Sequence, residues 1–389
     1  MKHRCKVLRI IPTLDPKYGG PAATIIDSSL LLYKDGFKVD ILTADEENSN
    51  FIKSKKIRLI NKGPRFANFN FGFKQSLWLL NHRHEYDIFI IHGIWHPNTL
   101  IARLFLKNKY FVFLHGMIDP YFGSGTGINA FKRIYKKIYW FLIERRNLLN
   151  SIAILLTSQG EKESIKKTFV NTNGIKKRII SYGIIKPKIN KKKILRKFFT
   201  KFPKFKNKEF YLFLGRFHEK KGCEIIIESV RKLKNNFNKM ILLAGPLTKS
   251  SYEIKIKKLI NNYNLQNKII LSNGLYNDQK WGAIQASKAM ILASHGENFG
   301  VSLVESLSLG KPVITTTKVN ISKEILRSKA GFIANNSVAS FSKTLGKFNR
   351  LKKKDLNKLK INSLKCFKQN FDLSSTKNSL GSLIKKNLN

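Results

Sequence analysis

The amino-acid sequence predicts an α/β protein built from two doubly wound domains, each with a parallel sheet covered by helices. Three observations lead to this fold class. The length of 389 residues is enough for two or three domains. Short apolar runs alternate with stretches of helical spacing, and runs that are apolar on both faces are typical of buried parallel strands. The alternation is interrupted once and then starts again, so the second half repeats the plan of the first.

The first series of elements occupies the N-terminal half. Val7–Ile11 is expected to be a buried strand, followed by a loop with Gly19 and Gly20 and by a helix that ends at Gly36. Further strands are expected at four runs: Lys38–Ala44, Tyr86–Gly93, Tyr110–Gly116 and Ile152–Ser158. Because open α/β sheets bind ligands beyond the carboxyl ends of their strands, functional residues are expected in the loops that follow them.

The interruption lies at residues 186–208, where Pro187, Pro203 and a dense run of lysines predict a basic linker or insertion. A second series follows, with strands expected at Phe210–Gly215, Lys239–Gly245, Lys268–Gly274, Ala289–Ser294 and Pro312–Thr316. We therefore expect one domain over residues 1–185 and a second over 209–370. The remaining residues, 371–389, are expected to form a C-terminal helix that packs back on the first domain.

The net charge is the abnormal feature of the composition, because 73 Lys and Arg against 24 Asp and Glu give +49. A nucleic-acid-binding surface, a membrane-binding surface and a compositional drift toward lysine would each produce it. Basic residues run the length of the chain, whereas nucleic-acid-binding proteins concentrate them on one face or arm. We favour drift with a weak attraction for anionic surfaces, and a basic nucleic-acid-binding protein stays as the less favoured alternative.

Cysteine use and hydropathy indicate the compartment. Three widely spaced cysteines without a C-x-x-C pair argue against a disulfide framework or a structural zinc site. The first apolar run is broken by Arg9 and ended by Pro12, which is too short for a signal-peptide core. No run approaches the roughly 20 apolar residues of a membrane span. A cytoplasmic protein is expected, with attachment to the inner membrane surface as the alternative.

Two segments of the second half carry residues suited to chemistry. GRFHEKKG places Arg216 and Lys221 between a strand and a helix, where fixed cations and helix amides favour a phosphate or diphosphate. ENFGVSLVESLSLGKPVI places Glu297 and Glu305 around Gly300, and carboxylates bind sugar hydroxyls by charge-assisted hydrogen bonds. Alternatively, the first segment is a solvated basic turn, and the two acids are helix-start and surface charges. The lack of a G-x-G-x-x-G fingerprint argues against a dinucleotide dehydrogenase.

Both segments resemble the retaining glycosyltransferases of family 4, which have the GT-B fold. ENFGVSLVESLSLGKPVI is similar to the family's E-x7-E signature, and GRFHEKKG is similar to its G-R-x4-K-G loop. PTLDPKYGGPAATI resembles the opening Gly-Gly loop, and HGMIDPYF resembles a subgroup that builds cell-surface polysaccharides. The resemblance implies two Rossmann-like domains facing a central cleft. The first would lie on the acceptor side and the second would hold a nucleotide sugar.

The resemblance also implies roles for five side chains. Arg216 and Lys221 would bind the donor diphosphate. Glu305 would hold the ribose and Glu297 the transferred sugar, while His115 would lie near the sugar's reacting face. Backbone contacts to substrate are implied at three further stretches: Gly19 and Gly20; Asn298, Phe299 and Gly300; and Val301, Ser302 and Leu303.

The implied reaction transfers a sugar from a UDP-sugar or GDP-sugar to a glycan or lipid-linked acceptor, with retention of anomeric configuration. Cations and amides aimed at the leaving diphosphate meet the electrostatic need, so neither a metal nor another cofactor is expected. A nucleotide-sugar epimerase or phosphorylase of the same fold is the alternative enzyme.

One further segment, Phe131–Asn150, mixes Lys, Arg, Tyr and Trp with aliphatic residues. It is either a helix that lies on anionic lipid or a core-packing helix with a basic outer face. We favour the core-packing interpretation.

Overall fold

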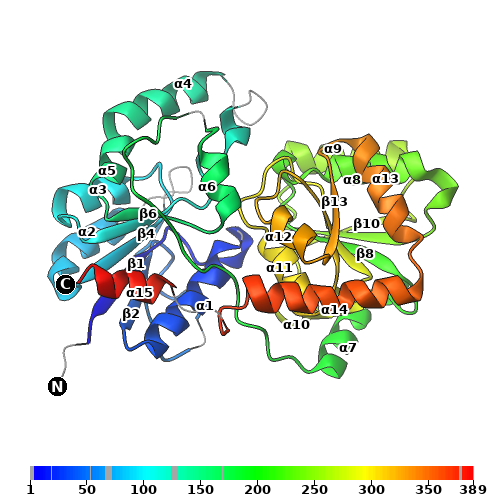
Figure 1. Cartoon of the computed structure of the whole chain (residues 1–389), viewed down its shortest axis with the longest axis horizontal. Coiled ribbons are helices and arrows are strands. Elements are labelled where there is room, and N and C mark those ends of the chain that lie inside the picture. The colour runs from blue at the N-terminus through cyan, green and yellow to red at the C-terminus, as the bar shows by residue number, and fades with distance from the viewer. Residues whose placement is uncertain are drawn as a thin grey trace. The chain divides into compact units, whose positions relative to one another are not determined.

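The computed structural model describes residues 4–18, 20–52, 54–65, 72–123, 130–168, 170–375 and 379–388. The chain divides into two compact units (Figure 1). The first unit comprises Met1–Tyr182 together with Thr376–Asn389, and the second comprises Gly183–Ser375.

The first unit is built on a parallel sheet of seven strands within the described residues, in the order β3-β2-β1-β4-β5-β6-β7. The bounds are β1 (Lys6–Ile10), β2 (Lys38–Thr43), β3 (Arg58–Asn61), β4 (Ile88–His92), β5 (Tyr110–Phe113), β6 (Ala153–Leu156) and β7 (Lys177–Ile179). The order reverses between β1 and β4, which pair in parallel with Leu8 opposite Phe89. The helices are α1 (Pro21–Lys34), α2 (Phe73–His82), α3 (Pro97–Phe105), α4 (Ala130–Tyr139), α5 (Arg145–Leu149), α6 (Gln159–Ile165) and α15 (Ser379–Lys386), and a π-helical turn, Trp140–Glu144, joins α4 to α5.

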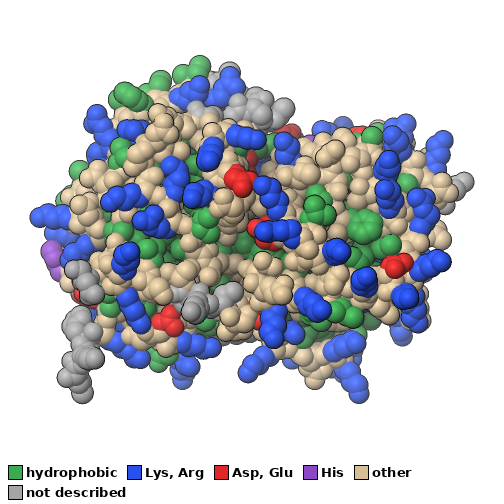
Figure 2. All heavy atoms as spheres, viewed as in Figure 1, with side chains coloured by type: hydrophobic (Ala, Val, Ile, Leu, Met, Phe, Trp, Pro, Cys, Tyr) green, Lys and Arg blue, Asp and Glu red, His purple; other side chains and the backbone are tan. Residues whose placement is uncertain are grey.

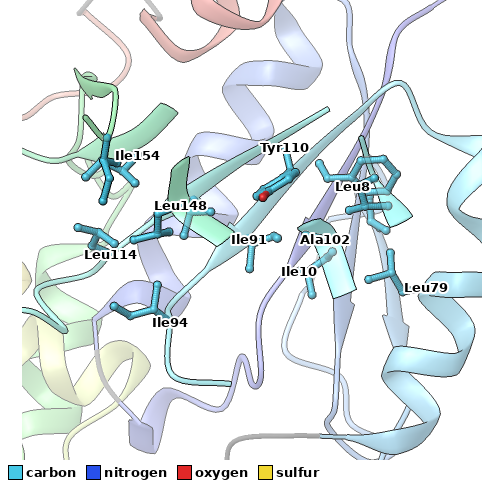
Figure 3. Close-up of a cluster of buried hydrophobic side chains, with 14 of the residues drawn as sticks. Leu8, Ile10, Leu79, Ile91, Ile94, Ala102, Tyr110, Leu114, Leu148 and Ile154 are labelled. Carbon is cyan, nitrogen blue, oxygen red and sulfur yellow. The ribbon is translucent and has the colours of Figure 1, made fainter. Parts of the chain in front are cut away.

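A large hydrophobic core of the first unit lies against this sheet (Figure 3). Leu8 and Ile91 from neighbouring strands are fully buried there, together with Leu79 of α2 and Leu148 of α5. Burying an aliphatic side chain of this size stabilises a fold by about 1.5–3 kcal/mol. The apolar runs that predicted the strands are therefore the residues that hold the helices on the sheet.

The second unit repeats the plan with six parallel strands among the residues described, in the order β10-β9-β8-β11-β12-β13. The bounds are β8 (Phe210–Leu214), β9 (Met240–Ala244), β10 (Ile269–Ser272), β11 (Ala289–Leu292), β12 (Val313–Thr316) and β13 (Gly331–Ala334). The helices are α7 (Lys191–Lys201), α8 (Cys223–Leu233), α9 (Ser251–Asn262), α10 (Asn277–Ala286), α11 (Val301–Ser308), α12 (Ser322–Arg327), α13 (Val338–Asn349) and α14 (Lys353–Asn370). The predicted fold class, two Rossmann-like parallel-sheet domains, is confirmed.

The stretch 186–208, predicted to be a basic linker or insertion, is largely helical and belongs to the second unit. Its helix α7 buries Ile194 and Phe198, which lie one helical turn apart. The fit against α10 is so close that a Cβ on Gly282 would lie 2.2 Å from the carbonyl oxygen of Ile194. The helix was not predicted from the sequence because its two buried residues stand among many lysines.

The boundaries between the two units also differ from the expected ones at residues 185 and 371. The first unit ends at Tyr182, and the chain returns to it at Thr376. The C-terminal helix α15 is part of the first unit, while residues 371–375 belong to the second.

Glu144 is a buried carboxylate in the first unit and gives a pH-dependent prediction. It is fully buried, and its Oε2 accepts a hydrogen bond from the backbone N–H of Trp95 at 3.3 Å. Burial raises the pKa of Glu144 to about 7. Because the folded pKa lies above the unfolded one, the free energy of unfolding falls as the pH rises from about 4.5 to about 7.

Glu144→Gln is therefore expected to stabilise the protein at about pH 8, by up to about 3 kcal/mol, and to have less effect at about pH 5. Urea unfolding at the two pH values measures the difference. The prediction fails if the variant is no more stable than the parent at the higher pH.

Candidate functional site

The predicted diphosphate loop lies at the carboxyl end of β8 in the second unit. Arg216 follows the strand and is exposed, and a 3-10 turn, Glu219–Lys221, leads to Gly222 at the start of α8. Gly222 has φ +64°, and a Cβ there would lie 2.1 Å from the carbonyl oxygen of Ala293. Only glycine fits this position, because both the left-handed backbone and the close approach exclude a side chain. The contact places the loop against the end of β11.

Lys221 and Glu297 form an ion pair that joins the two predicted segments, with Lys221 Nζ donating to Glu297 Oε2. The Glu297 backbone is held by Lys318 O, which accepts from its N–H at 3.0 Å, and by Asn320 N, which donates to its carbonyl at 3.0 Å. Burial alone would raise the pKa of Glu297, but Lys221, with Lys220 and Arg216, lowers it below its ordinary value. Glu297 is therefore a fixed, ionised acceptor at neutral pH.

The start of α11 completes this group. Gly300 has φ +76° at the N-cap position, and no side chain of the described residues caps the helix there. The first amides of a helix carry partial positive charge and lack partners within the helix, which suits an anion. Phe299 and Leu303 are buried, so these two residues offer the site their backbone only.

Glu305, one α11 position that sequence reasoning singled out, is largely buried and paired with a lysine. Lys280 of α10 donates to Glu305 Oε1 at 2.5 Å, and its ammonium lies 4.5 Å from the ring centroid of Trp281. Both predicted sugar-binding carboxylates thus have a lysine partner. Lys280 was missed because nothing distinguishes it in a chain so rich in lysine.

A second set of contacts ties the loop to the acidic turn. His295 Nε2 donates to Glu224 Oε1 at 2.7 Å, and Tyr252 donates to the other oxygen of Glu224. The backbone N–H of His295 donates to Lys220 O at 2.9 Å. Because Glu224 lies at the start of α8 and His295 two residues before Glu297, these bonds set how Lys221 meets Glu297.

His115, the predicted sugar contact of the first unit, lies just after β5 and is partly exposed. Its φ is +49°, an uncommon value for a residue with a side chain. Its ring stacks on those of His92 and Phe113, with centroids 5.2 Å away in each case. His115 Nε2 is 2.9 Å from His92 Nδ1, so the two imidazoles share a hydrogen bond.

Arg9 adds a third member to this hydrogen-bonded pair and fixes the direction of both hydrogen bonds. It lies fully buried on β1, and its Nε donates to His92 Nε2 at 3.1 Å. Because arginine can only donate, His92 must accept on Nε2 and carry its proton on Nδ1, which then donates to His115 Nε2. His115 is left with its proton on Nδ1. Burial first, and then the Arg9 charge, lower the pKa of His115 to about 3, so the ring is neutral.

The remaining predicted residues lie as follows. Gly20 precedes α1 with φ −61°, an ordinary helical value, and Gly19 lies outside the described residues. Asn298 accepts a hydrogen bond from Asn320 Nδ2 at 3.3 Å, beside Glu297. Val301 and Ser302 form the first turn of α11. In the parts of the chain that the structure describes, no three His, Cys, Asp or Glu side chains gather as metal ligands would.

Two family models match the chain, one to each half. The model of Glycosyltransferase Family 4 matches residues 18–186, and the model of Glycosyl transferases group 1 matches residues 196–365. The second match contains Arg216, Lys221, Glu297 and Glu305.

Individual proteins give the same picture. An uncharacterised glycosyltransferase of Methanocaldococcus jannaschii is 27% identical over 59% of this chain and 55% of its own length. A protein of Salmonella typhimurium named "Putative colanic acid biosynthesis glycosyltransferase WcaL" is 24% identical over 44% of this chain and 43% of its own. The chain thus spans about half the length of these curated relatives. Anabaena HepE, solved with UDP and glucose, covers 99% of both chains with a TM-score of 0.74 at 14% identity, which shows the shared fold.

Proposed function

Since this chain belongs to the GT-B glycosyltransferases, with a family 4 region followed by a group 1 region, we propose that it transfers a sugar from a nucleotide-diphosphate donor to a surface-glycan acceptor. The acceptor is a glycan or its lipid-linked precursor. The name of the WcaL relative, which refers to colanic acid biosynthesis, supports a role in glycan assembly. The observation that carries the proposal is the Lys221–Glu297 ion pair beside the uncapped start of α11.

The donor is a UDP-sugar or GDP-sugar held by the second unit. Arg216, Lys221 and the first amides of α11 supply positive charge for the diphosphate, while Glu297 accepts from hydroxyls of the transferred sugar. Glu305 accepts from the ribose. Lys221 moves its hydrogen bonds from Glu297 to the diphosphate when the donor binds, which frees the carboxylate for the sugar. HepE, which shares the fold, was solved with UDP and glucose.

The reaction follows from where charge develops. Breaking the bond between the anomeric carbon and the phosphate oxygen leaves negative charge on the diphosphate, which preorganised donors stabilise. The departing phosphate oxygen takes the proton of the acceptor hydroxyl, whose oxygen forms the new bond on the same face with retention. His115 donates a hydrogen bond to the sugar from Nδ1. No metal or other cofactor is needed for these steps.

The proposed location is the cytoplasm or the inner face of the membrane. None of the helices in the described part of the chain is long and apolar enough to cross a bilayer.

Thermal unfolding with a panel of nucleoside diphosphates and their sugars tests the donor. One base series is expected to stabilise the second unit, by about 2.7 kcal/mol at 100-fold excess over Kd. Product analysis with and without an acceptor then identifies the reaction. Turnover of the donor in the absence of an acceptor would indicate an epimerase, dependence on inorganic phosphate would indicate a phosphorylase, and no stabilisation by any donor would contradict the proposal.

A further inference from the structure

An apolar stripe runs along the outside of one helical segment of the first unit, residues 130–149, which comprises α4, the π-helical turn and α5. Its members are exposed over 54–80% of their surface: Phe131, Ile134, Tyr135, Ile138, Phe141 and Leu142. They recur three and four residues apart, so they share one face of the helix. From Phe131 to Leu142 this face is about 17 Å long at 1.5 Å per residue. We call it the exposed stripe.

The opposite face of the segment fixes this orientation. Trp140 and Glu144 are buried, and Trp140 Nε1 donates to Asn171 O at 3.0 Å. The ammonium of Lys136 lies 5.0 Å from the ring centroid of Trp95. The segment is therefore anchored by its other side, and the apolar side faces outward. The segment packs on the core through Trp140 and Leu148, as the favoured sequence-based interpretation expected, but its outer face is apolar as well as basic.

The charge next to the exposed stripe has one sign. Lys137 and Arg146 are exposed on the same segment, and its one acidic residue, Glu144, is buried. Figure 2 shows hydrophobic side chains together with Lys and Arg side chains over the part of the surface that α4 forms. An anionic partner meets this surface without facing an exposed carboxylate of the segment.

We propose that the exposed stripe is the surface by which this protein lies on an anionic lipid bilayer. Phe, Tyr and aliphatic side chains on one helix face, flanked by Lys and Arg, are the composition of helices that lie in the membrane interface. A second copy of the chain suits the stripe less well, because each copy carries a net charge of +49. Binding to a bilayer would bring the protein to the lipid-linked acceptor of the proposed function, and it can be measured without sugar transfer.

Cosedimentation with phosphatidylcholine vesicles, with or without phosphatidylglycerol, is the test. The parent protein is expected to bind the anionic vesicles. The stripe variant, Ile134→Ser with Ile138→Ser and Phe141→Ser, is expected to bind them at least about tenfold more weakly. The matched control removes three apolar side chains of similar exposure elsewhere, Phe73→Ser with Leu326→Ser and Ile361→Ser, and is expected to bind as the parent does.

Three further measurements complete the design. Lys137→Gln with Arg146→Gln is expected to remove the preference for phosphatidylglycerol. Donor thermal shifts without vesicles are expected to be the same for the stripe variant and the parent, which separates lipid binding from donor binding. The proposal is overturned if the parent ignores anionic vesicles, if the stripe variant binds like the parent, or if sedimentation velocity shows a dimer that the stripe variant loses while lipid binding is absent.

Discussion

Replacing Arg216 and Lys221 together with alanine is expected to lower kcat/KM by a factor of about 10² to 10⁴. Each charge-assisted contact to the donor diphosphate contributes about 1.5–3 kcal/mol, and every 1.36 kcal/mol of transition-state stabilisation is a factor of ten in rate. The loss is expected mainly in kcat, because the diphosphate gains charge as the sugar leaves. Steady-state kinetics with the donor identified by thermal shift measures both constants.

The controls separate charge at the site from charge in general. Lys232→Ala with Lys347→Ala removes two exposed lysines of the same unit and is expected to leave kcat/KM unchanged. Because Lys221 is the ion-pair partner of Glu297, the thermal midpoint of each variant is measured as well. Arg216→Lys with Lys221→Arg, which keeps both charges, is expected to recover part of the rate. Unchanged turnover in the folded alanine double variant would remove these two residues from the mechanism.

Lys221→Ala alone also changes Glu297. Without its nearest cation the carboxylate stays buried, and the pKa of Glu297 is expected to rise. Donor binding by this variant should therefore weaken at a higher pH than in the parent as the solution is acidified. Such a shift in the pH dependence of donor binding would show that Lys221 keeps Glu297 ionised. A variant that had lost only a contact to the diphosphate would show no such shift.

The strand pattern was predictable because the central strands are buried on both faces. The edge strands β3, β7 and β13 were not expected. Arg58 and Lys177 begin two short strands that are only partly apolar, and β13 is only four residues long. Helix α7 was hidden for a related reason, since its two buried residues, Ile194 and Phe198, stand among lysines. Strands and helices can be predicted from the sequence where a long run of residues is buried. They are missed at the edges of a sheet or domain, where only two or three buried side chains hold the element in place.

The site divides in the same way. Arg216, Lys221, Glu297 and Glu305 could be proposed from the sequence because their spacing within two local segments is distinctive. Their partners were not found, because contact between distant segments depends on the order of strands in the sheet. Arg9 is recognisable in the sequence as a charged residue inside an apolar strand. The sequence does not indicate, however, that His92, 83 residues away, accepts its hydrogen bond.

Arg9→Met is expected to lower kcat by about tenfold to a hundredfold with little change in the KM for the donor. Arg9 touches neither the donor nor the acceptor in the proposed mechanism; it fixes the proton of His92 on Nδ1 and so leaves the Nδ1–H of His115 as the donor to the sugar. Methionine has similar length but cannot donate. Both imidazoles are then free to take the other tautomer, and loss of one preorganised donor typically costs about 10²–10³ in kcat.

The pH profile tells this positioning role from a general loss of packing. The Arg9 charge, after burial, holds the pKa of His115 down at about 3, so its removal raises the pKa of His115. A protonated His115 keeps its Nδ1–H but places a positive charge beside a sugar that itself becomes positive as the bond to phosphate breaks. The activity of Arg9→Met should therefore fall on the acid side at a higher pH than that of the parent. A purely structural defect lowers the thermal midpoint and the rate but leaves the acid limb of the pH–activity profile at the same pH.

Two further variants decide between charge and geometry. Arg9→Lys keeps the positive charge but lacks an Nε–H at the position that faces His92, so it should retain the parent's acid limb while kcat stays reduced. Arg178→Met removes an exposed arginine from β7 of the same sheet and should match the parent in both. If Arg9→Met folds and keeps the parent's kcat and pH profile, then the Arg9–His92–His115 chain does not act in transfer, and His115 is held in place by its neighbours for packing alone.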